Sequence, residues 1–443
     1  MARRRHSGKT PPHLLLVAMH FPPSRASGVY RPLAMANHFA SRGWRVTVVT
    51  VTTDFFEHIT QSADPTLEGA VHGDVCVVRA PMGLQRLETD TRRFGYMRAN
   101  FPLLHSAFWD WTERALFPDL YSSWIPGVVR AGLRVHRHSP VSVVLATGNP
   151  WSAFGAAWAF ARFTRVPYVM DYRDSWTLDQ FNVCDAFPPD HPAWAWERRL
   201  IGGASRVVFV NDPMRQWHAK RYPRDADRMV VVENGWDAGL LGAPAFRRPG
   251  ADGPLRLGYV GTVTTQLPHD VTWKGWKLAM DEPALAAATI TLYGHLGFFA
   301  KSVARVRALL PLDGDSRVFW AGPVGKREVL SAYEELDILL MMIPSSPYVT
   351  GGKVYEYMAS GRPIVAIHSP DTAASDPLRG YPLYFPVREL SEEAVRDALV
   401  AAATRAATIT EADFLACLDH ARRYERSTLL DAFDAQLREV ANA

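Results

Sequence analysis

Short apolar runs alternate with amphipathic and polar stretches along most of the chain. Apolar runs of this length are typical of strands buried in a parallel sheet, and the stretches between them predict helices. In the first half we predict strands at residues 13–18, 44–51, 75–79, 141–146, 167–170, 204–210 and 228–232. In the second half we predict strands at residues 255–261, 290–293, 317–320, 338–342, 363–367 and 382–385. Helices are predicted over residues 30–42, 151–164, 392–407 and 411–440.

This alternation predicts an α/β fold with two doubly wound domains that face a cleft. A chain of 443 residues is too long for one ordinary core, which agrees with two domains. Residues 239–254 are rich in Gly, Ala, Pro and Arg, so we expect a linker between domains at residues 13–238 and 255–420. Residues 1–12 are basic and end in two prolines, which favours a disordered tail.

Composition disfavours several classes of protein. The formal net charge is only +4 and no zinc-finger or RNA-binding spacing is present, so no nucleic-acid partner is expected. Cys76, Cys184 and Cys417 are scattered, which fits a reducing compartment and argues against a disulfide scaffold or a metal cluster. No apolar run reaches the ~18 residues that span a bilayer, and the N-terminus lacks the apolar stretch of a signal peptide. We therefore expect a cytoplasmic protein, with membrane contact that is at most peripheral.

The most informative segment is residues 351–366, which read GGKVYEYMASGRPIVA. It predicts a loop, a short helix, a Gly-Arg-Pro turn and a buried strand. Gly351 and Gly352 leave backbone N–H groups open to a ligand, and a helix N-terminus suits a phosphate. Lys353 can reach that phosphate or be an ordinary solvated lysine. Glu356 lies about one turn further, where it can accept hydrogen bonds from ribose hydroxyls or be a helix-surface glutamate.

This segment resembles the nucleotide-sugar site of the family 4 glycosyltransferases, which carry a glutamate followed by Met-Ala, a Gly and a Pro at this spacing. Three other parts of the chain also resemble this family: residues 13–50, Asn-Gly-Trp-Asp at 234–237 and Leu-Gly-Tyr-Val-Gly at 257–261. The resemblance implies a GT-B architecture of two Rossmann-like domains, the first for the acceptor and the second for the nucleotide-sugar donor. It also implies a C-terminal helix at 421–443 that crosses back to the first domain, and a closure that excludes water.

The implied reaction moves a hexosyl group from a nucleotide diphosphate to an acceptor hydroxyl with retention of configuration. No cofactor, metal or protein nucleophile is expected, because the donor β-phosphate would assist the acceptor hydroxyl. The implied acceptor is a sugar, a lipid-linked or a small molecule, in cell-surface polysaccharide or natural-product glycoside biosynthesis. No strongly basic amphipathic helix is recognisable, which favours a soluble acceptor. The implied donor-binding residues are Gly28, Gly261, Thr262, Lys274, Gly351, Gly352, Lys353, Val354 and Glu356.

Four residues are candidates for the catalytic group. Lys274, in Trp-Lys-Gly-Trp, resembles a family lysine that neutralises the leaving diphosphate, although the two tryptophans can instead mark a packing turn. Arg173 and Asp174 lie in an Asp-x-Arg-Asp-x-Trp sequence that resembles a bacterial subgroup of the family. The arginine can bind a phosphate or an acidic acceptor and Asp174 can orient it, or the two can form an internal pair that stiffens the loop. Asn149 can hydrogen-bond to the sugar or cap the following helix.

Aromatic side chains are candidates for the acceptor pocket. A stretch with few charges can line such a pocket, rest on a membrane surface or pack between helices. It contains Phe108, Trp109, Trp111, Phe117, Tyr121 and Trp124. His20 follows the first predicted strand, so it borders the cleft or is structural. The acceptor-binding candidates are His20, Trp109, Trp111, Trp151 and Trp176.

Three positions depart from the family pattern and keep other functions open. Tyr348 stands where many members have a second glutamate, Thr262 where an arginine usually follows the glycine, and Gly148-Asn149 where a His-Glu is often found. The alternatives are a nucleotide-sugar epimerase or hydrolase, a cyclitol-coupling enzyme on the same fold, or a catalytically inactive GT-B partner subunit. A nicotinamide-dependent dehydrogenase is disfavoured, because neither half shows a complete GxGxxG after its first strand.

Overall fold

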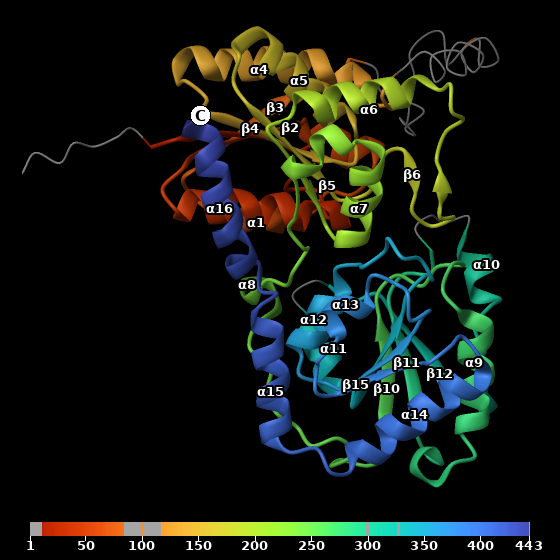
Figure 1. The fold of residues 1–443 in the computed structure, drawn as a ribbon. Helices are drawn as coiled ribbons and strands as arrows, with labels where there is room; N and C mark the ends of the chain where they lie inside the picture. The colour runs from red at the N-terminus through yellow and green to blue at the C-terminus, as the bar shows by residue number, and fades with distance from the viewer. Residues whose placement is uncertain (1–10, 84–99, 101–116, 298–301, 326–327, 443) are drawn as a thin grey trace, which may run out of the picture. The chain divides into compact units, whose positions relative to one another are not determined.

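The computed structural model describes residues 11–83, 100, 117–297, 302–325 and 328–442. The chain divides into two compact units (Figure 1). Unit 1 contains the described residues up to Leu178, the segment Asp185–Val232 and the end of the chain from Leu430. Unit 2 contains Asp179–Cys184 and Glu233–Leu429. Each unit has a parallel sheet of its own, which confirms the predicted α/β fold class.

The sheet of unit 1 has seven parallel strands in the order β3-β2-β1-β4-β5-β8-β9. The strand order reverses between β1 and β4, which makes their carboxyl ends a topological switch point, the usual ligand position in open α/β sheets. The strands are β1 (His13–Val17), β2 (Arg45–Val51), β3 (Val75–Ala80), β4 (Val143–Gly148), β5 (Tyr168–Tyr172), β8 (Arg206–Phe209) and β9 (Met229–Val231).

Helices cover both faces of this sheet, and each layer has its own apolar core. One core joins the strands to α4, α5 and α6, and the other joins them to α1 and α16 (Figure 1). On the second face the rings of Phe39 and Phe433 lie 6.0 Å apart, so residues near the two ends of the chain share a core. The helices are α1 (Tyr30–Ser41), α4 (Ile125–His138), α5 (Ser152–Thr164), α6 (Pro192–Gly203), α7 (Asp212–Arg221) and α16 (Arg426–Asn442).

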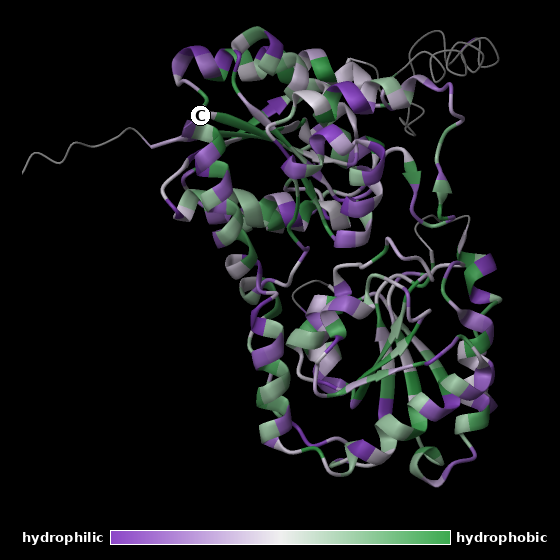
Figure 2. Ribbon diagram, viewed as in Figure 1, coloured by the Kyte–Doolittle hydropathy of each residue, from purple (hydrophilic) through white to green (hydrophobic). Residues whose placement is uncertain are grey.

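The sheet of unit 2 repeats this plan with six parallel strands in the order β12-β11-β10-β13-β14-β15. Its switch point lies between β10 and β13. The apolar colour of the strands in both sheets reflects burial on two faces (Figure 2). The strands are β10 (Arg256–Val260), β11 (Thr289–Tyr293), β12 (Val318–Gly322), β13 (Ile338–Met342), β14 (Ile364–Ile367) and β15 (Tyr384–Pro386).

The two faces of the second sheet are also covered by different helices. The helices α9 and α14 contribute to one core, and α11, α12 and α15 contribute to the other. The helices of this unit are α8 (Ala238–Leu241), α9 (His269–Ala279), α10 (Val303–Arg307), α11 (Val329–Glu335), α12 (Lys353–Ala359), α13 (Ser375–Leu378), α14 (Glu392–Ala406) and α15 (Glu411–Arg422).

Several predicted elements differ in their bounds, and two of these differences have a clear structural cause. The helix predicted over 411–440 is interrupted between α15 and α16, because Glu425 forms a β-bridge with Trp236 and the Trp236 carbonyl accepts a hydrogen bond from the backbone N–H of Arg426. The strand predicted to end at residue 170 continues through Asp171 and Tyr172, which pair with β8. Sequence periodicity does not reveal either feature, since both depend on a partner segment far along the chain.

A further two-stranded sheet is formed by β6 (Leu178–Asp179) and β7 (Cys184–Asp185). Within the part of the chain that the structure describes, no helix is both long enough and apolar enough to cross a membrane. The predicted acceptor residues Trp109 and Trp111 lie outside the described residues.

Candidate functional site

Most of the donor residues predicted from the sequence meet at the switch point of unit 2, whereas Gly28 lies in unit 1. Gly261 follows β10, and the loop that leads into α12 follows β13, the neighbouring parallel strand. Tyr357 of α12 ties the helix to this edge, since its hydroxyl accepts a hydrogen bond of 2.8 Å from the backbone N–H of Val260. The first turn of α12 is thereby held beside the carboxyl end of β10.

Lys353 is the residue that links these segments. Its ammonium donates a hydrogen bond to the hydroxyl of Tyr259 and lies 4.0 Å from the centroid of that ring. A Cβ atom placed on Gly261 would lie 2.3 Å from the Lys353 Nζ, and Gly261 has a φ of +150°. Glycine at this position therefore leaves the space that the ammonium occupies, and it also allows a backbone conformation that other residues rarely adopt.

The electrostatic state of this lysine is unusual. Burial lowers the pKa of Lys353 to about 7, and the negative charge of Glu356 opposes that shift. An ammonium has three N–H donors, and Tyr259 takes one of them. No carboxylate of the described residues forms an ion pair with Lys353. An enclosed cation in this state gains stability from an anionic ligand, because the ligand supplies the missing charge partner.

Glu356 lies one turn further along α12. Its Oε2 accepts a hydrogen bond of 3.1 Å from the hydroxyl of Tyr333 in α11. Burial, followed by the charge of Glu356, raises the pKa of Tyr333 well above its ordinary value, so this hydroxyl remains a donor. Val354 is fully buried and anchors the helix to the core, while Glu356 stays partly exposed.

The glycines before α12 leave the backbone accessible. Gly351 has a φ of +72°, which favours glycine, and a Cβ atom on either Gly351 or Gly352 would meet nothing within 4 Å. In the same unit, the carbonyl of Thr262 accepts a hydrogen bond of 3.0 Å from Tyr259. Tyr348 lies in the loop before these glycines, where its backbone N–H donates to the Ser346 hydroxyl. Open space thus lies beside the loop that carries Lys353.

Lys274 does not join this group. It lies in the middle of α9, and its ammonium donates a hydrogen bond of 2.9 Å to Asp270 within the same exposed helix turn. That hydrogen bond is the main reason why the pKa of Lys274 is raised. Gly275 packs against Val395 of α14, and Trp276 is buried. The helix α9 belongs to the core on the opposite face of the sheet from α12. In this structure the Trp-Lys-Gly-Trp sequence therefore packs α9 against its neighbours.

A second group of predicted residues meets at the switch point of unit 1. Arg173, directly after β5, donates hydrogen bonds to three carbonyls, those of Gly28 at 2.7 Å, Gly148 at 3.0 Å and Asn149. A Cβ atom on Gly28 would lie 2.1 Å from the Arg173 Nη1, so a larger residue there would force the guanidinium to shift. The guanidinium joins the loops that follow β1, β4 and β5. Arg173 therefore stiffens these loops, and it does so through their backbone carbonyls.

His20 borders the same group. Its Nδ1 is buried and has no hydrogen-bond partner among the described residues. Burial, followed by the positive charge of Arg173, lowers the pKa of His20 to about 4, so the imidazole is neutral near neutral pH. Burial lowers the pKa of the Arg173 guanidinium, and the negative charges of Asp174 and Asp171 oppose that shift. The group therefore offers a neutral imidazole and a cation at one sheet edge.

Asp171 and Arg31 form a buried pair that sequence reasoning missed. Asp171 is fully buried in β5 and receives hydrogen bonds from both Nε (3.1 Å) and Nη2 (2.7 Å) of Arg31, which also binds the Val232 carbonyl at 2.9 Å. The Asp171 of the Asp-x-Arg-Asp-x-Trp sequence is thus a structural residue. No local signal identifies this pair, because Arg31 lies in α1 far from β5.

Trp151 and Trp176 are stacked on each other, with ring centroids 6.3 Å apart. Trp176 is only 4% exposed, so most of its surface packs in the core. Its outer edge lines an apolar cavity of about 210 Å³ that also contacts Trp158 and Trp196. Glu197 of α6 carries a fully buried carboxylate in the same unit. It accepts hydrogen bonds from Tyr172 (2.9 Å), Tyr222 (2.6 Å) and Thr177.

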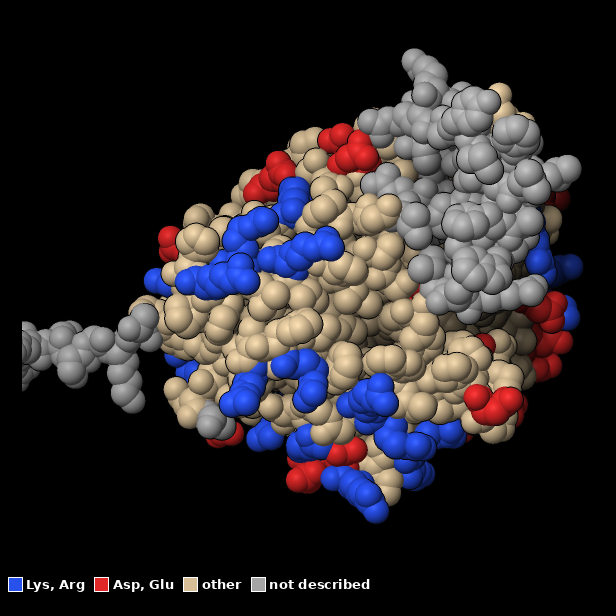
Figure 3. Space-filling view, turned by 90° about the horizontal axis from the view of Figure 1, so that it is seen from above, with Lys and Arg blue, Asp and Glu red and all other residues tan. Residues whose placement is uncertain are grey.

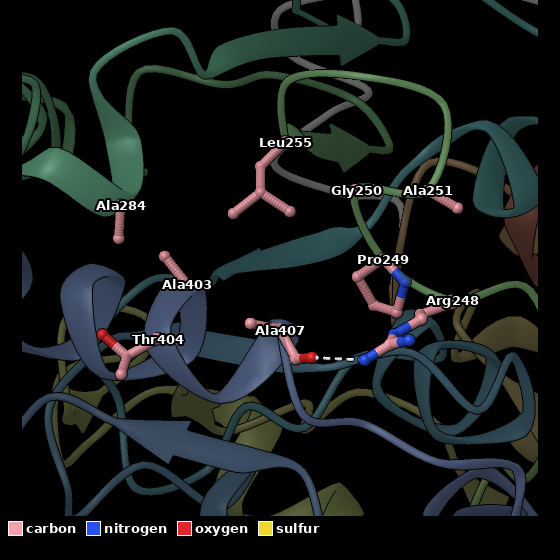
Figure 4. Close-up of a pocket in the computed structure, with 9 residues that line it drawn as sticks. All are labelled: Arg248, Pro249, Gly250, Ala251, Leu255, Ala284, Ala403, Thr404 and Ala407. Atoms are coloured by element: carbon pink, nitrogen blue, oxygen red, sulfur yellow. Dashed lines mark hydrogen bonds between the residues drawn. The ribbon is translucent and has the colours of Figure 1, made fainter.

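The larger cavity of about 600 Å³ is not at either switch point. It lies in unit 2 between the segment before β10 and the end of α14, at the amino-terminal edge of the sheet (Figure 4). Arg248 closes one side by donating a hydrogen bond of 2.9 Å to the Ala407 carbonyl. Ligands of open α/β sheets gather at the carboxyl edge, so this cavity is a weak candidate. Among the described residues, no group of three or more His, Cys, Asp or Glu side chains is arranged to hold a metal ion.

Comparison of whole structures defines the class of fold. Sucrose-phosphate synthase from Thermosynechococcus elongatus superposes with a TM-score of 0.65 at 14% identity and covers 98% of this chain and 100% of that one. Anabaena HepE in complex with UDP-glucose superposes with a TM-score of 0.58 at 15% identity and covers 96% of this chain and 99% of that one. The protein therefore has the GT-B fold of two parallel α/β sheets.

Comparison of sequences agrees with that class. Residues 28–235 match the glycosyl transferase 4-like domain family. The putative teichuronic acid biosynthesis glycosyltransferase TuaH of Bacillus subtilis (strain 168) is 26% identical over 185 residues, which are 40% of this chain and 44% of that protein. The match thus spans less than half of the length of this relative. In sequence, these parts of the chain are therefore similar to glycosyltransferases.

Proposed function

We propose that this protein is a glycosyltransferase that transfers a hexosyl group from a nucleotide diphosphate sugar to an acceptor hydroxyl. The observation that carries the proposal is the position of the Lys353 ammonium at the switch point of unit 2, between Tyr259 and Gly261 and without an ion-pair partner among the described residues. A diphosphate is the ligand that this arrangement suits best, since it places two negative charges beside an enclosed cation.

The donor would be bound by the two charged residues of α12 and the loop before it. The diphosphate would lie beside Lys353 and the open backbone of Gly351 and Gly352, and the ribose hydroxyls would donate to the carboxylate of Glu356. Tyr333 supports this role, because its hydroxyl already orients one oxygen of that carboxylate at 3.1 Å. The nucleotide complexes of the HepE structures are consistent with such a donor.

The acceptor would bind at the switch point of unit 1. Arg173 is held there by three carbonyls, and His20 presents a neutral imidazole whose pKa is about 4. A neutral imidazole can accept or donate a hydrogen bond to a sugar hydroxyl without a change of protonation. Asn149 and Asp174 remain candidates for the same surface. The name of the TuaH relative favours an acceptor in cell-surface polysaccharide biosynthesis.

The proposed chemistry relies on charge stabilisation and positioning. As the bond between the sugar and the diphosphate breaks, negative charge develops on the β-phosphate, and the Lys353 ammonium would stabilise that charge. The acceptor oxygen would form the new bond on the same face of the sugar, so that configuration is retained, and its proton would pass to the departing phosphate oxygen. Two exposed free thiols, Cys76 and Cys184, fit a cytoplasmic location.

Thermal melts with UDP, GDP, dTDP and ADP and their sugar conjugates test the proposal, because a ligand of the folded state raises the midpoint. We expect one nucleotide to raise the midpoint of the wild type and to have no effect on Lys353→Met. The matched control is Lys274→Met, which also removes one lysine of unit 2 but should respond as the wild type does. Equal responses of both variants would contradict the donor site.

Product analysis with the nucleotide sugar that the melts select separates the alternatives. Release of free sugar or of an epimer from the donor without any acceptor would indicate a hydrolase or epimerase in the same fold. Binding without turnover, together with co-purification of an active homologue, would indicate an inactive partner subunit. No response to any nucleotide would remove the support for a nucleotide-dependent function.

A further inference from the structure

The helix layer formed by α4, α5 and α6 carries an unusual set of exposed side chains. This layer covers one face of the unit 1 sheet (Figure 1). We call its outer surface the basic helix face, which is defined by the exposed arginines Arg130, Arg134, Arg137, Arg162, Arg165, Arg198 and Arg199. Four of these residues belong to α5 and α6 or directly follow α5, and three belong to α4.

The helix α4 contributes three of these arginines from one side of the helix. Arg130, Arg134 and Arg137 are spaced by four and three residues, so they lie along one side of the helix. The opposite side is buried in the core of unit 1 through Val128 and Ala131. The expectation that the chain has no strongly basic amphipathic helix is therefore wrong. The pattern is visible in the sequence once the bounds of α4 are known.

Acidic side chains do not balance this face. The three helices contain a single acidic residue, Glu197, and that residue is fully buried. None of the seven arginines forms an ion pair with a described residue. Seen from above, Lys and Arg side chains form groups on both sides of a largely uncharged strip, and Asp and Glu lie near the edges and beside the lower group (Figure 3). The basic helix face therefore has a positive potential that the described residues leave uncompensated.

Apolar groups occur among the arginines. Phe163 lies between Arg162 and Arg165 in sequence and is 72% exposed, the largest exposed fraction among the large hydrophobic residues described. The tryptophan-lined cavity of about 210 Å³ is built from the same helix layer, through Trp158 of α5 and Trp196 of α6. An exposed phenylalanine beside several cations costs free energy in water and gains it in an interface that is both anionic and apolar.

We propose that the basic helix face binds the surface of an anionic lipid bilayer. The guanidinium groups would contact lipid phosphates, for which their planar geometry is suited, and Phe163 would enter the boundary between headgroups and acyl chains. A nucleic acid would satisfy the arginines but would leave Phe163 without an apolar environment, so the bilayer accounts for more of the surface. This inference concerns unit 1 alone and does not depend on the nucleotide site of unit 2.

Co-sedimentation of the full chain with vesicles of phosphatidylcholine and about 30% phosphatidylglycerol tests the proposal, because the anionic lipid gives the vesicle a negative surface potential. We expect binding to these vesicles, weak binding to pure phosphatidylcholine, and a loss of binding as salt rises. Each arginine near such a surface contributes about fivefold to partitioning. The triple variant Arg130→Gln, Arg134→Gln, Arg137→Gln should therefore bind about a hundredfold more weakly.

A matched variant of unit 2 controls for net charge. Lys277, Arg305 and Arg388 are exposed, and their triple replacement by Gln removes the same three charges without touching the basic helix face. It should bind vesicles as the wild type does. Equal losses in the two triple variants would overturn the proposal, since binding would then follow net charge alone. Equal binding of the wild type to pure phosphatidylcholine would also overturn it.

Phe163→Ser separates a bilayer from another polyanion. It keeps every charge and replaces a side chain that packs little against the fold, so we expect normal circular dichroism and about tenfold weaker vesicle binding. Unchanged vesicle binding by this variant would overturn the bilayer in favour of a simple polyanion. Binding of the wild type to single-stranded oligouridine, without binding to the vesicles, would indicate a nucleic-acid surface and would also overturn the proposal.

Discussion

The ammonium of Lys353 lies over the ring of Tyr259, 4.0 Å from its centroid, and donates a hydrogen bond to the hydroxyl of the same side chain. The tyrosine thus stabilises the cation through its ring face and through its oxygen, although neither provides a full negative charge. This relationship explains how a lysine can be enclosed at the end of β10 while it still has the capacity to bind an anion.

Donor affinity should depend on pH through Lys353. Burial lowers the pKa of this lysine to about 7, so its charged form predominates below that pH and is lost as pH rises through it. Since the charged form attracts the diphosphate, we expect affinity to be highest below about pH 7 and to fall by up to about tenfold per unit above it. Calorimetric titration with the nucleotide sugar selected by the melts, from pH 6 to 9, measures this dependence.

The control for that profile is Lys353→Arg, because a guanidinium stays charged over the whole range. Its affinity should vary little with pH. His20 cannot account for the wild-type slope, since its pKa is about 4. A wild-type profile that is flat from pH 6 to 9 would contradict the role of Lys353.

Tyr333→Phe should weaken nucleotide binding by about tenfold, or roughly 1.4 kcal/mol. The substitution removes the hydroxyl that donates at 3.1 Å to the Glu356 carboxylate, which is then less well oriented for ribose hydroxyls. Calorimetric titration measures the affinity. Tyr381→Phe is a matched control, because its buried hydroxyl donates to the Arg362 carbonyl at 2.9 Å elsewhere in unit 2. Unchanged affinity of Tyr333→Phe would show that Glu356 does not need this orientation.

Gly28→Ala should destabilise unit 1 by about 1–3 kcal/mol. The new Cβ atom would lie 2.1 Å from the Arg173 Nη1, so the guanidinium would have to leave the carbonyls that it joins. Urea unfolding followed by tryptophan fluorescence measures the change, and nucleotide binding by unit 2 should persist. In the control Gly73→Ala the added Cβ atom meets nothing within 4 Å, and stability should change little. Equal stability of the two variants would show that Arg173 moves aside without cost.

Asp171→Ala should cost about 3–5 kcal/mol of stability, because it leaves the buried Arg31 guanidinium without its charge partner. Urea unfolding again provides the measurement. Asp185→Ala breaks an exposed ion pair with Arg221 at 2.8 Å in the same unit and should cost less than about 1 kcal/mol. Similar losses in the two variants would contradict the buried character of the Arg31–Asp171 pair.

Much of the secondary structure was predictable from local sequence. The strand at residues 338–342 and the helix that begins at residue 30 were found where the apolar pattern placed them, as β13 and α1. The reason is that a strand buried on both faces is a continuous apolar run, and a helix against a sheet repeats its apolar residues every three to four positions. Each of these two patterns is contained in a short stretch of the sequence.

The interruption between α15 and α16 was not predictable in this way. Residues 411–440 keep a helical pattern, but Glu425 pairs with the backbone of Trp236. In the same manner the strand predicted to end at residue 170 includes Asp171 only because Asp171 pairs with Val208 of β8. These choices depend on segments that only the folded chain brings together, and hydrophobic periodicity does not specify such partners.

By itself the sequence determined that the chain forms two parallel α/β sheets, and it singled out Gly261, Lys353 and Glu356 individually. Only the tertiary structure decided that Lys353 belongs beside Gly261 and that Lys274 does not, because strand order places β10 next to β13 and α9 on the other face. The basic helix face has the same origin, since its arginines come from three helices. Spacing along a chain encodes the surface of one element, whereas the arrangement of several elements is set by the packing of their apolar faces.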